Sequence, residues 1–247
     1  MNQFRSYQPT EFDPWDGVLL IDKPATFTSH DVVAKVRNHF RLKKVGHGGT
    51  LDPLATGLLI LLLGRGTRLS DRIMGSDKTY EGVMRLGIST DSQDADGQVI
   101  EERSAAHVSE DLLREQMAKR VGDQMQTPPM VSAVKKNGVP LYKLARKGET
   151  IEREARFIHV YQFQLNGKTG DEASFTLRCT KGTYVRTLCA DIGEELGCGA
   201  HLKALRRTRS GNFSIDDAIT LPDLLALDPA AFLQRIIPIR QVPALLA

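Results

Sequence analysis

The sequence predicts an α+β protein with a mostly antiparallel sheet. Segments with apolar residues at helical spacing are interspersed with segments of strand-like alternation, in the order β-α-β-α-β-β-α-β-β-α-β. Strands that follow one another without an intervening helix form antiparallel hairpins, whereas a strand, a helix and a second strand favour a crossover. With 247 residues, of which 41% are hydrophobic, the chain is long enough to bury a substantial core.

Composition and charge restrict the class of protein. The 33 basic and 30 acidic side chains give a net charge of +3, which by itself indicates no particular partner. The three cysteines, Cys179, Cys189 and Cys198, show no C-x-x-C spacing and are typical of a reducing compartment. Residues 1–16 lack the apolar core of a signal peptide, and the apolar run at 58–63 is much shorter than the ~20 residues that span a bilayer. We therefore expect a cytoplasmic protein without a membrane partner.

The first third of the chain predicts a strand, a helix and a second buried element. After a polar lead-in over residues 1–16, Gly17 to Ile21 reads as a buried strand. Ser29 is expected to cap a helix that continues to Phe40. The run LLILLL at 58–63, closed by Gly64, predicts a buried strand or helix.

The middle of the chain continues with a short helix from Gly64 to Met74 and a strand from Lys78 to Leu86. The turn DADG at 94–97 precedes a short strand, and Ser109 is expected to cap a helix that ends near Gly122. Prolines, glycines and basic residues then interrupt every periodicity from Met125 to Thr150, which predicts a long, mobile, basic insertion loop.

The last part of the chain returns to regular patterns. Alternation over 155–165 and again over 173–179 predicts two paired antiparallel strands. A helical stripe runs from Tyr184 to Leu196, and 201–209 is strand-like. We expect residues 17–247 to form a single domain around the insertion.

The stretch KVGHGGTLDPLATGLL at 44–59 carries the strongest chemical signal. Pro53 lacks an amide donor and biases Asp52 towards an extended conformation, so that this carboxylate stands on a stiff loop. Gly46, Gly48 and Gly49 allow positive φ angles and the close approach of another molecule. Asp52 could therefore cap a turn or act in catalysis.

Cofactor and metal sites find little support in the sequence. The P-loop pattern G-x-x-x-x-G-K-[ST] is absent, and no G-x-G-x-x-G follows the first strand. The six histidines are scattered, without H-E-x-x-H or cysteine partners. The segment DSQDADGQ fits a hairpin turn better than a calcium loop, because Ser92 and Arg103 would fall at its two ends. We expect neither a metal nor a nucleotide cofactor.

Five segments follow one another along the chain: GVLLIDKPATFTSHDVV, GHGGTLDPLATGLLILLLGRGTR, SDKTYEGVMRLGISTDSQDADGQV, PPMVSAVKKNGVPLYKLARKG and KGTYVRTLCADIGEELGCGAHLKALRRT. Together they resemble the bacterial TruB family of tRNA pseudouridine synthases. The resemblance covers about residues 17–240. It implies the pseudouridine synthase fold, with 17–247 as the catalytic domain, and isomerisation of the uridine at position 55 in the tRNA T loop. The uracil is flipped out, detached from ribose at N1, rotated and rejoined through C5, without a cofactor. The implied partner is the T arm of tRNA, and the implied state is a monomer.

The resemblance also implies a set of catalytic residues. Asp52 matches the catalytic aspartate, and Arg186 in GTYVR matches the arginine that pairs with it. Asp94 matches a second aspartate that holds this arginine, against the simpler reading that Asp94 is only a turn residue. Tyr80 matches the aromatic residue that stacks on the target base and can act as an acid or base at C5. Whether Asp52 attacks C1′ or removes the 2′ proton is left open.

Four further residues match groups that bind the substrate. His47 corresponds to a histidine that occupies space in the T loop, and Tyr184 and Leu205 correspond to groups that line the base pocket. Lys23 is expected to support the aspartate loop or a phosphate. Relatives commonly continue into a small C-terminal RNA-binding domain, which we expect this chain to lack.

Two other functions remain open at this point. The same pocket could serve an RNA-folding helper that opens and releases the T loop without catalysis. Alternatively, the glycine loop could hold the phosphates of a cofactor in an enzyme of another kind. The helper predicts that tRNA refolding survives loss of Asp52, and the cofactor enzyme predicts nucleotide binding without RNA.

Overall fold

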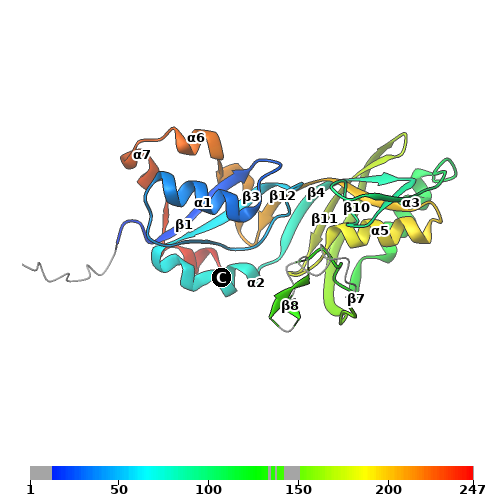
Figure 1. The fold of residues 1–247 in the computed structure, drawn as a ribbon, viewed down its shortest axis with the longest axis horizontal. Coiled ribbons are helices and arrows are strands. Elements are labelled where there is room, and N and C mark those ends of the chain that lie inside the picture. The colour runs from blue at the N-terminus through cyan, green and yellow to red at the C-terminus, as the bar shows by residue number, and fades with distance from the viewer. Residues whose placement is uncertain (1–12, 133–134, 137, 142–150, 247) are drawn as a thin grey trace, which may run out of the picture. The chain divides into compact units, whose positions relative to one another are not determined.

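The computed structural model describes residues 13–132, 135–136, 138–141 and 151–246 (Figure 1). The chain divides into two compact units, each assembled from separate stretches of sequence. The first unit comprises Met1–Pro53, Gly57–Met74 and Gly211–Ala247, and the second comprises Leu54–Thr56 and Gly75–Ser210. Both units alternate strands with helices, so the α+β prediction is confirmed.

The first unit is built on two long strands that are almost entirely buried. Strand β1 (Gly17–Lys23) pairs antiparallel with β3 (Thr56–Leu63), so the ambiguous run LLILLL is a strand. Because both of its faces are covered, its residues are apolar without alternation. Three short strands pair with these two. Strand β2 (Val45–His47) is antiparallel to β3, β15 (Ile237–Pro238) is antiparallel to β1, and β14 (Ile219–Thr220) is parallel to β1. Ile73, Phe213 and Val242 pack into the same core.

Helix α1 (Ser29–His39) begins one residue earlier than the predicted cap allows. The N-cap is Thr28, whose hydroxyl accepts a hydrogen bond from the Asp31 amide at 3.0 Å. The Asp31 carboxylate accepts one from the Thr28 amide at 2.8 Å, which completes a capping box. The prediction that Ser29 caps this helix is therefore wrong, and Ser29 serves a different contact described below.

The remaining helices of the first unit are short. The segment from Gly64 forms the 3₁₀ helix η1 (Gly64–Leu69) followed by α2 (Ser70–Gly75), where one short helix was predicted. Near the C-terminus follow α6 (Leu221–Leu225), α7 (Pro229–Gln234) and the 3₁₀ helices η2 (Ile215–Asp217) and η3 (Val242–Leu245). Helix α6 contacts both α1 and β1.

In the second unit, a row of five strands follows the order β12-β4-β11-β10-β7, and all neighbours in it are antiparallel. Their bounds are Ala200–Ser210 (β12), Lys78–Leu86 (β4), Glu172–Cys179 (β11), Arg156–Thr169 (β10) and Gly122–Gln126 (β7). Helix α3 (Glu110–Lys119) packs on β10, helix α5 (Val185–Glu195) packs on β12, and the two helices touch. The predicted antiparallel character of the sheet is confirmed.

Two small hairpins accompany this sheet. Strands β5 (Ile88–Thr90) and β6 (Val99–Glu102) flank the segment DSQDADGQ, so this segment is the predicted hairpin turn. Strands β8 (Lys135–Lys136) and β9 (Val139–Pro140) form the second hairpin. Residues 133–134, 137 and 142–150, which belong to the predicted mobile insertion, lie outside the described residues.

The predicted insertion begins too early. Met125 and Gln126 belong to β7 and pair with Phe157 and Arg156 of β10. The strand escaped prediction because its Met125 side chain is 63% exposed, so that GDQMQ lacks the usual apolar alternation. Helix α3 likewise ends at Lys119, before the predicted Gly122, because Gly122 has a positive φ of 105° and opens the strand.

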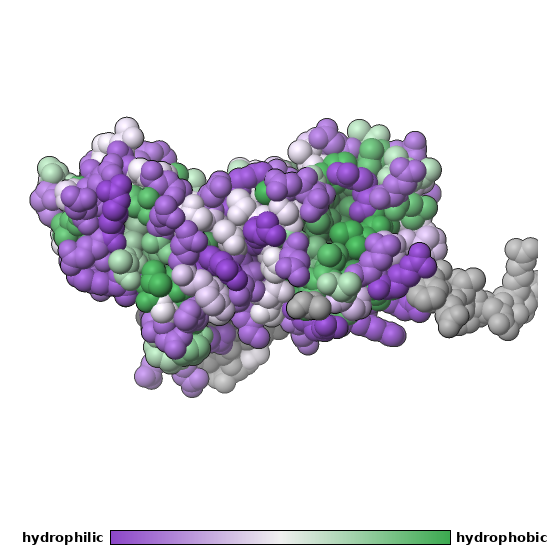
Figure 2. Space-filling model, turned by 180° about the vertical axis from the view of Figure 1, so that it is seen from behind, coloured by the Kyte–Doolittle hydropathy of each residue, from purple (hydrophilic) through white to green (hydrophobic). Residues whose placement is uncertain are grey.

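Hydrophilic residues dominate the face of the molecule in Figure 2, and the hydrophobic residues on that face gather over the first unit. Partly buried residues such as Leu69, Ile237 and Leu245 surround the core of this unit. Within the part of the chain that the structure describes, no helix is both long and apolar enough to cross a membrane.

Candidate active site

Asp52 stands exposed on the loop between β2 and β3, and both of its neighbours are fixed. On one side, the buried Ser29 hydroxyl accepts a hydrogen bond from the Leu51 amide at 2.8 Å and lies 3.1 Å from the Leu51 carbonyl oxygen. On the other side, the Pro53 carbonyl accepts a hydrogen bond from the Thr26 amide at 2.9 Å. The backbone on either side of the carboxylate is thus held in place, as the stiff-loop prediction required.

Lys23, at the end of β1, is fully buried and ties two loops together. Its Nζ donates to the carbonyl oxygens of Pro24 at 2.9 Å, Phe27 at 2.6 Å and Pro53 at 3.4 Å. A buried ammonium needs such acceptors, because its three donors have lost water. Of the two roles expected for Lys23, this geometry corresponds to support of the aspartate loop.

Replacement of Lys23 by Met is expected to loosen the Asp52 loop. Methionine has a similar length but donates no hydrogen bonds, so the carbonyls that Lys23 satisfies are left in the protein interior. We expect a loss of about 2–3 kcal/mol in the free energy of unfolding, measured by urea denaturation. Lys35→Met is the matched control, since Lys35 is exposed and overlies the Phe27 ring, and it should cost less than about 1 kcal/mol. Equal losses in the two variants would refute the role of Lys23.

The glycine-rich loop is more constrained than its sequence implies. Among its three glycines only Gly49 has a positive φ, of 139°. Gly46 lies in β2, and a Cβ on Gly48 would approach Ile73 Cγ2 to 2.4 Å, so Gly48 is required by packing. The sequence allowed a positive φ at all three positions, and of these only Gly49 adopts one. His47 is half-buried in β2, opposite Leu61 of β3.

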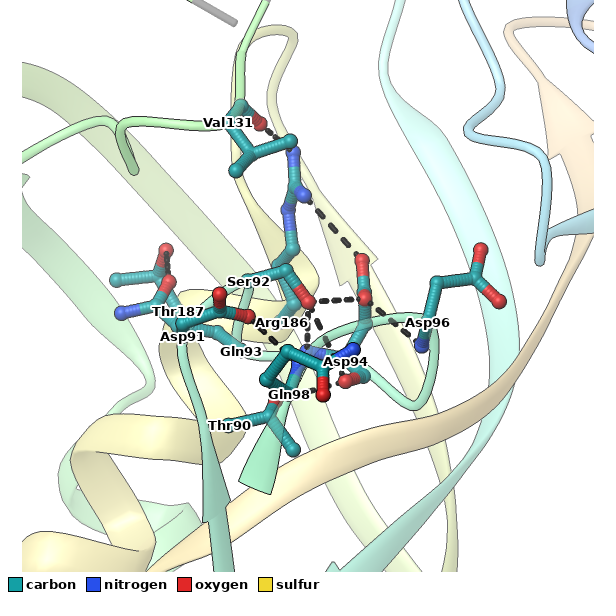
Figure 3. Close-up of polar contacts among 10 residues, drawn as sticks. All are labelled: Thr90, Asp91, Ser92, Gln93, Asp94, Asp96, Gln98, Val131, Arg186 and Thr187. Carbon is teal, nitrogen blue, oxygen red and sulfur yellow. Dashed lines mark hydrogen bonds and ion pairs between the residues drawn. The ribbon is translucent and has the colours of Figure 1, made fainter. Parts of the chain in front are cut away.

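Arg186 and Asp94 form a buried ion pair in the second unit (Figure 3). Arg186 is the second residue of α5, and its Nη1 lies 3.3 Å from Asp94 Oδ2. Its Nη2 donates to the Val131 carbonyl oxygen at 2.6 Å. Arg186 is 4% exposed and Asp94 is 5% exposed, so water screens this pair little. The two bonds fix the plane of the guanidinium.

Asp94 is itself held by its own turn. The Ser92 hydroxyl donates to Asp94 Oδ1 at 2.5 Å, and the Asp96 amide donates to the same oxygen at 3.2 Å (Figure 3). The turn docks on β12, where Leu202 exchanges backbone hydrogen bonds of 3.0 Å with Ala95 and Gln93. Asp94 is therefore both a turn residue and the charge partner of Arg186. Ser92 was not among the predicted site residues, although it lies in the motif that carried the resemblance.

Tyr184 precedes α5 and is positioned through its backbone. Gln126 is buried, and its side-chain Nε2 donates to the Tyr184 carbonyl oxygen at 3.0 Å. Its Oε1 accepts a hydrogen bond from the Tyr184 backbone amide at 2.8 Å. The Tyr184 ring is half-buried, with its centroid 5.7 Å from the Arg186 guanidinium carbon. Sequence reasoning missed Gln126 because it assigned this residue to the mobile insertion.

Tyr80 lies on β4 with 9% of its surface exposed, between Leu177 of β11 and Arg207 of β12. Leu205 is half-buried on β12, opposite Gly82. The alternation that placed Tyr80 on a buried face of this strand was correctly predicted. Arg207 was not predicted as a site residue, because a basic run such as RRTR is usually a solvated face.

The eight predicted site residues fall into two groups. Lys23, His47 and Asp52 belong to the first unit, and Tyr80, Asp94, Tyr184, Arg186 and Leu205 belong to the second. Within the second unit, Arg186 contacts Asp94 and lies beside Tyr184. The pairing of Asp52 with Arg186 would join the two units and stays a prediction.

Comparison with known proteins places this arrangement in one family. The family model described as TruB family pseudouridylate synthase, N-terminal domain, matches residues 37–185, and the tRNA pseudouridylate synthase B C-terminal domain matches 186–240. The chain is 54% identical over 226 residues to tRNA pseudouridine synthase B of Opitutus terrae, covering 92% of this chain and 94% of that protein. It is 47% identical to the protein of the same name from Dechloromonas aromatica, covering 91% and 75%.

Solved structures agree on the fold. A chain in the crystal structure of a Cbf5–Nop10–Gar1 complex superposes with a TM-score of 0.73 at 32% identity and matches 92% of this chain. The present chain spans 61% of the length of that relative. Since the first family model alone covers more than half of the sequence and the relative from Opitutus terrae is matched nearly end to end, the chain belongs to the TruB family of pseudouridylate synthases.

Proposed function

We propose that this chain converts the uridine at position 55 in the T loop of tRNA to pseudouridine, and that Asp52 and Arg186 act on the same nucleotide. Family membership and the name shared by the curated relatives support this substrate. One observation carries the assignment of the catalytic group: Asp52 is an exposed carboxylate whose neighbours, Leu51 and Pro53, are both fixed by buried side chains or backbone. An exposed but rigid carboxylate can meet a bound ribose without first being ordered.

The reaction needs no external group. The N1–C1′ bond of uridine breaks and a C5–C1′ bond forms, while the C5 hydrogen leaves as a proton and N1 gains one, so atoms and electrons balance. Asp52 acts either by attacking C1′ or by taking the 2′ proton, and both paths require its ionised form. The released uracil must stay in the pocket while it rotates.

Arg186 keeps that carboxylate ionised in the complex. A bound nucleotide would exclude water from Asp52 and favour its neutral form, whereas a nearby guanidinium favours the charged form. Asp94 and Val131 already fix the guanidinium plane through Nη1 and Nη2. Arg186 can therefore present its charge in one direction without reorganisation.

The remaining side chains hold the base and the loop. Tyr80 stacks on the target uracil and serves as the acid or base at C5, while Tyr184 and Leu205 line the pocket. His47 occupies the space that the flipped uridine leaves in the T loop. Stacking on aromatic rings is the usual way in which proteins bind unpaired bases of RNA. We further propose that the protein is cytoplasmic and acts as a monomer on one T arm. Light scattering of the complex measures its mass and so tests the monomeric state.

The experiment that tests this function follows the C5 hydrogen. A T-arm hairpin transcribed with uridine tritiated at C5 should release one tritium per RNA into water when the wild-type chain acts on it. A matched hairpin with cytidine at position 55 and all other uridines tritiated should release none. Absence of release from the first hairpin, or equal release from both, would overturn the proposal.

A further inference from the structure

Arg207 is a buried cation that directly neighbours a predicted catalytic residue. It lies on β12, is 1% exposed and is among the largest fully buried side chains of the described residues. In the register of the sheet it stands opposite Tyr80 on β4, and the two side chains form a hydrogen bond. Burial of a guanidinium costs free energy, so its place beside the phenol calls for a compensating interaction.

The surroundings of Tyr80 on its own strand are also fixed. Lys78, two residues earlier on the same face of β4, is 6% exposed and donates to the Ser76 carbonyl at 2.6 Å. Gly82, two residues later, leaves a space that the Phe175 ring fills, since a Cβ on Gly82 would lie 2.3 Å from Phe175 Cζ. Tyr80 thus lies between a buried ammonium and a buried ring.

Arg207 interacts electrostatically with both Lys78 and Tyr80. Burial first, and the positive charge of Arg207 second, lower the pKa of Lys78 to about 8. Burial lowers the pKa of Arg207 itself, and the interactions with Tyr80 oppose this shift. Both effects indicate that the guanidinium, the ammonium and the phenol share one poorly hydrated region of the second unit.

We propose that Arg207 is a positioning residue for catalysis, which holds the Tyr80 hydroxyl at one place through their hydrogen bond. The inference rests on the proposed function, in which Tyr80 stacks on uracil and moves a proton at C5. The strand and Phe175 limit where the ring can lie, but rotation about the Cα–Cβ bond still displaces the hydroxyl at the far end of the ring. A fixed guanidinium donor removes this freedom and keeps the phenol in reach of C5.

A double-mutant cycle distinguishes this role from mere support of the sheet. The variants are Arg207→Gln, Tyr80→Phe and the two combined, with single-turnover tritium release and T-arm Kd as the measurements. Arg207→Gln should lower the rate about 10²-fold, as expected for a misplaced catalytic group. Once Tyr80→Phe has removed the hydroxyl, the same change should cost no more than about twofold. The Kd should stay within about threefold of wild type throughout.

Two further variants keep the test sound. Arg207→Lys retains a buried cation and therefore the fold, and it should react at a rate between those of wild type and Arg207→Gln. Lys203→Gln removes an exposed cation of the same strand that pairs with Glu172, and it should leave the rate within about twofold. If the wild type is active and the rate losses of Arg207→Gln and Tyr80→Phe multiply in the double variant, this inference alone is overturned. A wild type that releases no tritium would overturn the proposed function instead.

Discussion

Replacement of Asp52 by asparagine is expected to lower the rate of pseudouridine formation by at least about 10³-fold. Asparagine has nearly the same shape, and the bonds from Ser29, Lys23 and Thr26 to the backbone of Leu51 and Pro53 stay in place. The variant can neither attack C1′ nor take a proton. Its Kd for a T-arm hairpin should stay within a few fold of wild type, so single-turnover tritium release and equilibrium binding together measure the effect.

Asp71→Asn is a suitable control, because Asp71 is an exposed carboxylate of the same unit on α2. It should leave the rate within about twofold. Wild-type activity in Asp52→Asn would remove Asp52 from the catalytic role. The same variant also tests the hypothesis of an RNA-folding helper. That hypothesis predicts that Asp52→Asn still refolds tRNA as well as the wild type does.

Replacement of Arg186 by glutamine is expected to damage both catalysis and stability. The change leaves the buried Asp94 carboxylate without its charge partner, and breaking a buried pair in this way costs about 3–5 kcal/mol. The rate should fall about 10²–10³-fold, because Asp52 also loses the charge that keeps it ionised next to the bound nucleotide. Urea denaturation and tritium release measure the two effects separately.

Asp94→Asn in the Arg186→Gln background provides the control for stability. If Asp94 serves mainly to hold Arg186, the double variant should recover part of the lost free energy of unfolding, since no unpaired charge is left buried. The rate should not recover, because Arg186 is still missing. A wild-type rate in Arg186→Gln would contradict the assigned role of this arginine.

Local sequence predicted most of the fold where one physical pattern dominates. Strands β1 and β3 are continuous apolar runs because both faces are buried, and β4, β10 and β11 alternate because neighbouring side chains have different surroundings. Pro53 alone was enough to predict a stiff loop at Asp52. The capping residue of α1 was misplaced because both Thr28 and Ser29 are common caps, and the bonds of Thr28 with Asp31 and of Ser29 with Leu51 decide for Thr28.

Long-range contacts determine what the sequence could not show. Strand β7 is polar, and the role of Gln126 becomes visible only from its hydrogen bond to the Tyr184 backbone, 58 positions further along the chain. Arg207 looks like part of a solvated basic run until the strand register places it opposite Tyr80. Asp94 and Arg186 were proposed from resemblance to a family, since neither periodicity nor composition singles them out. Their contact in the second unit gives that proposal a physical basis.

The structure of the Asp52→Asn chain bound to a T-arm hairpin would show whether Asp52 and Arg186 act on one nucleotide. The variant is expected to hold the uridine in its unreacted form. We expect the side chain of residue 52 to lie within about 4 Å of both the Arg186 guanidinium and the ribose of the flipped uridine. A complex in which the uridine remains stacked in the T loop, or is bound away from Arg186, would contradict it.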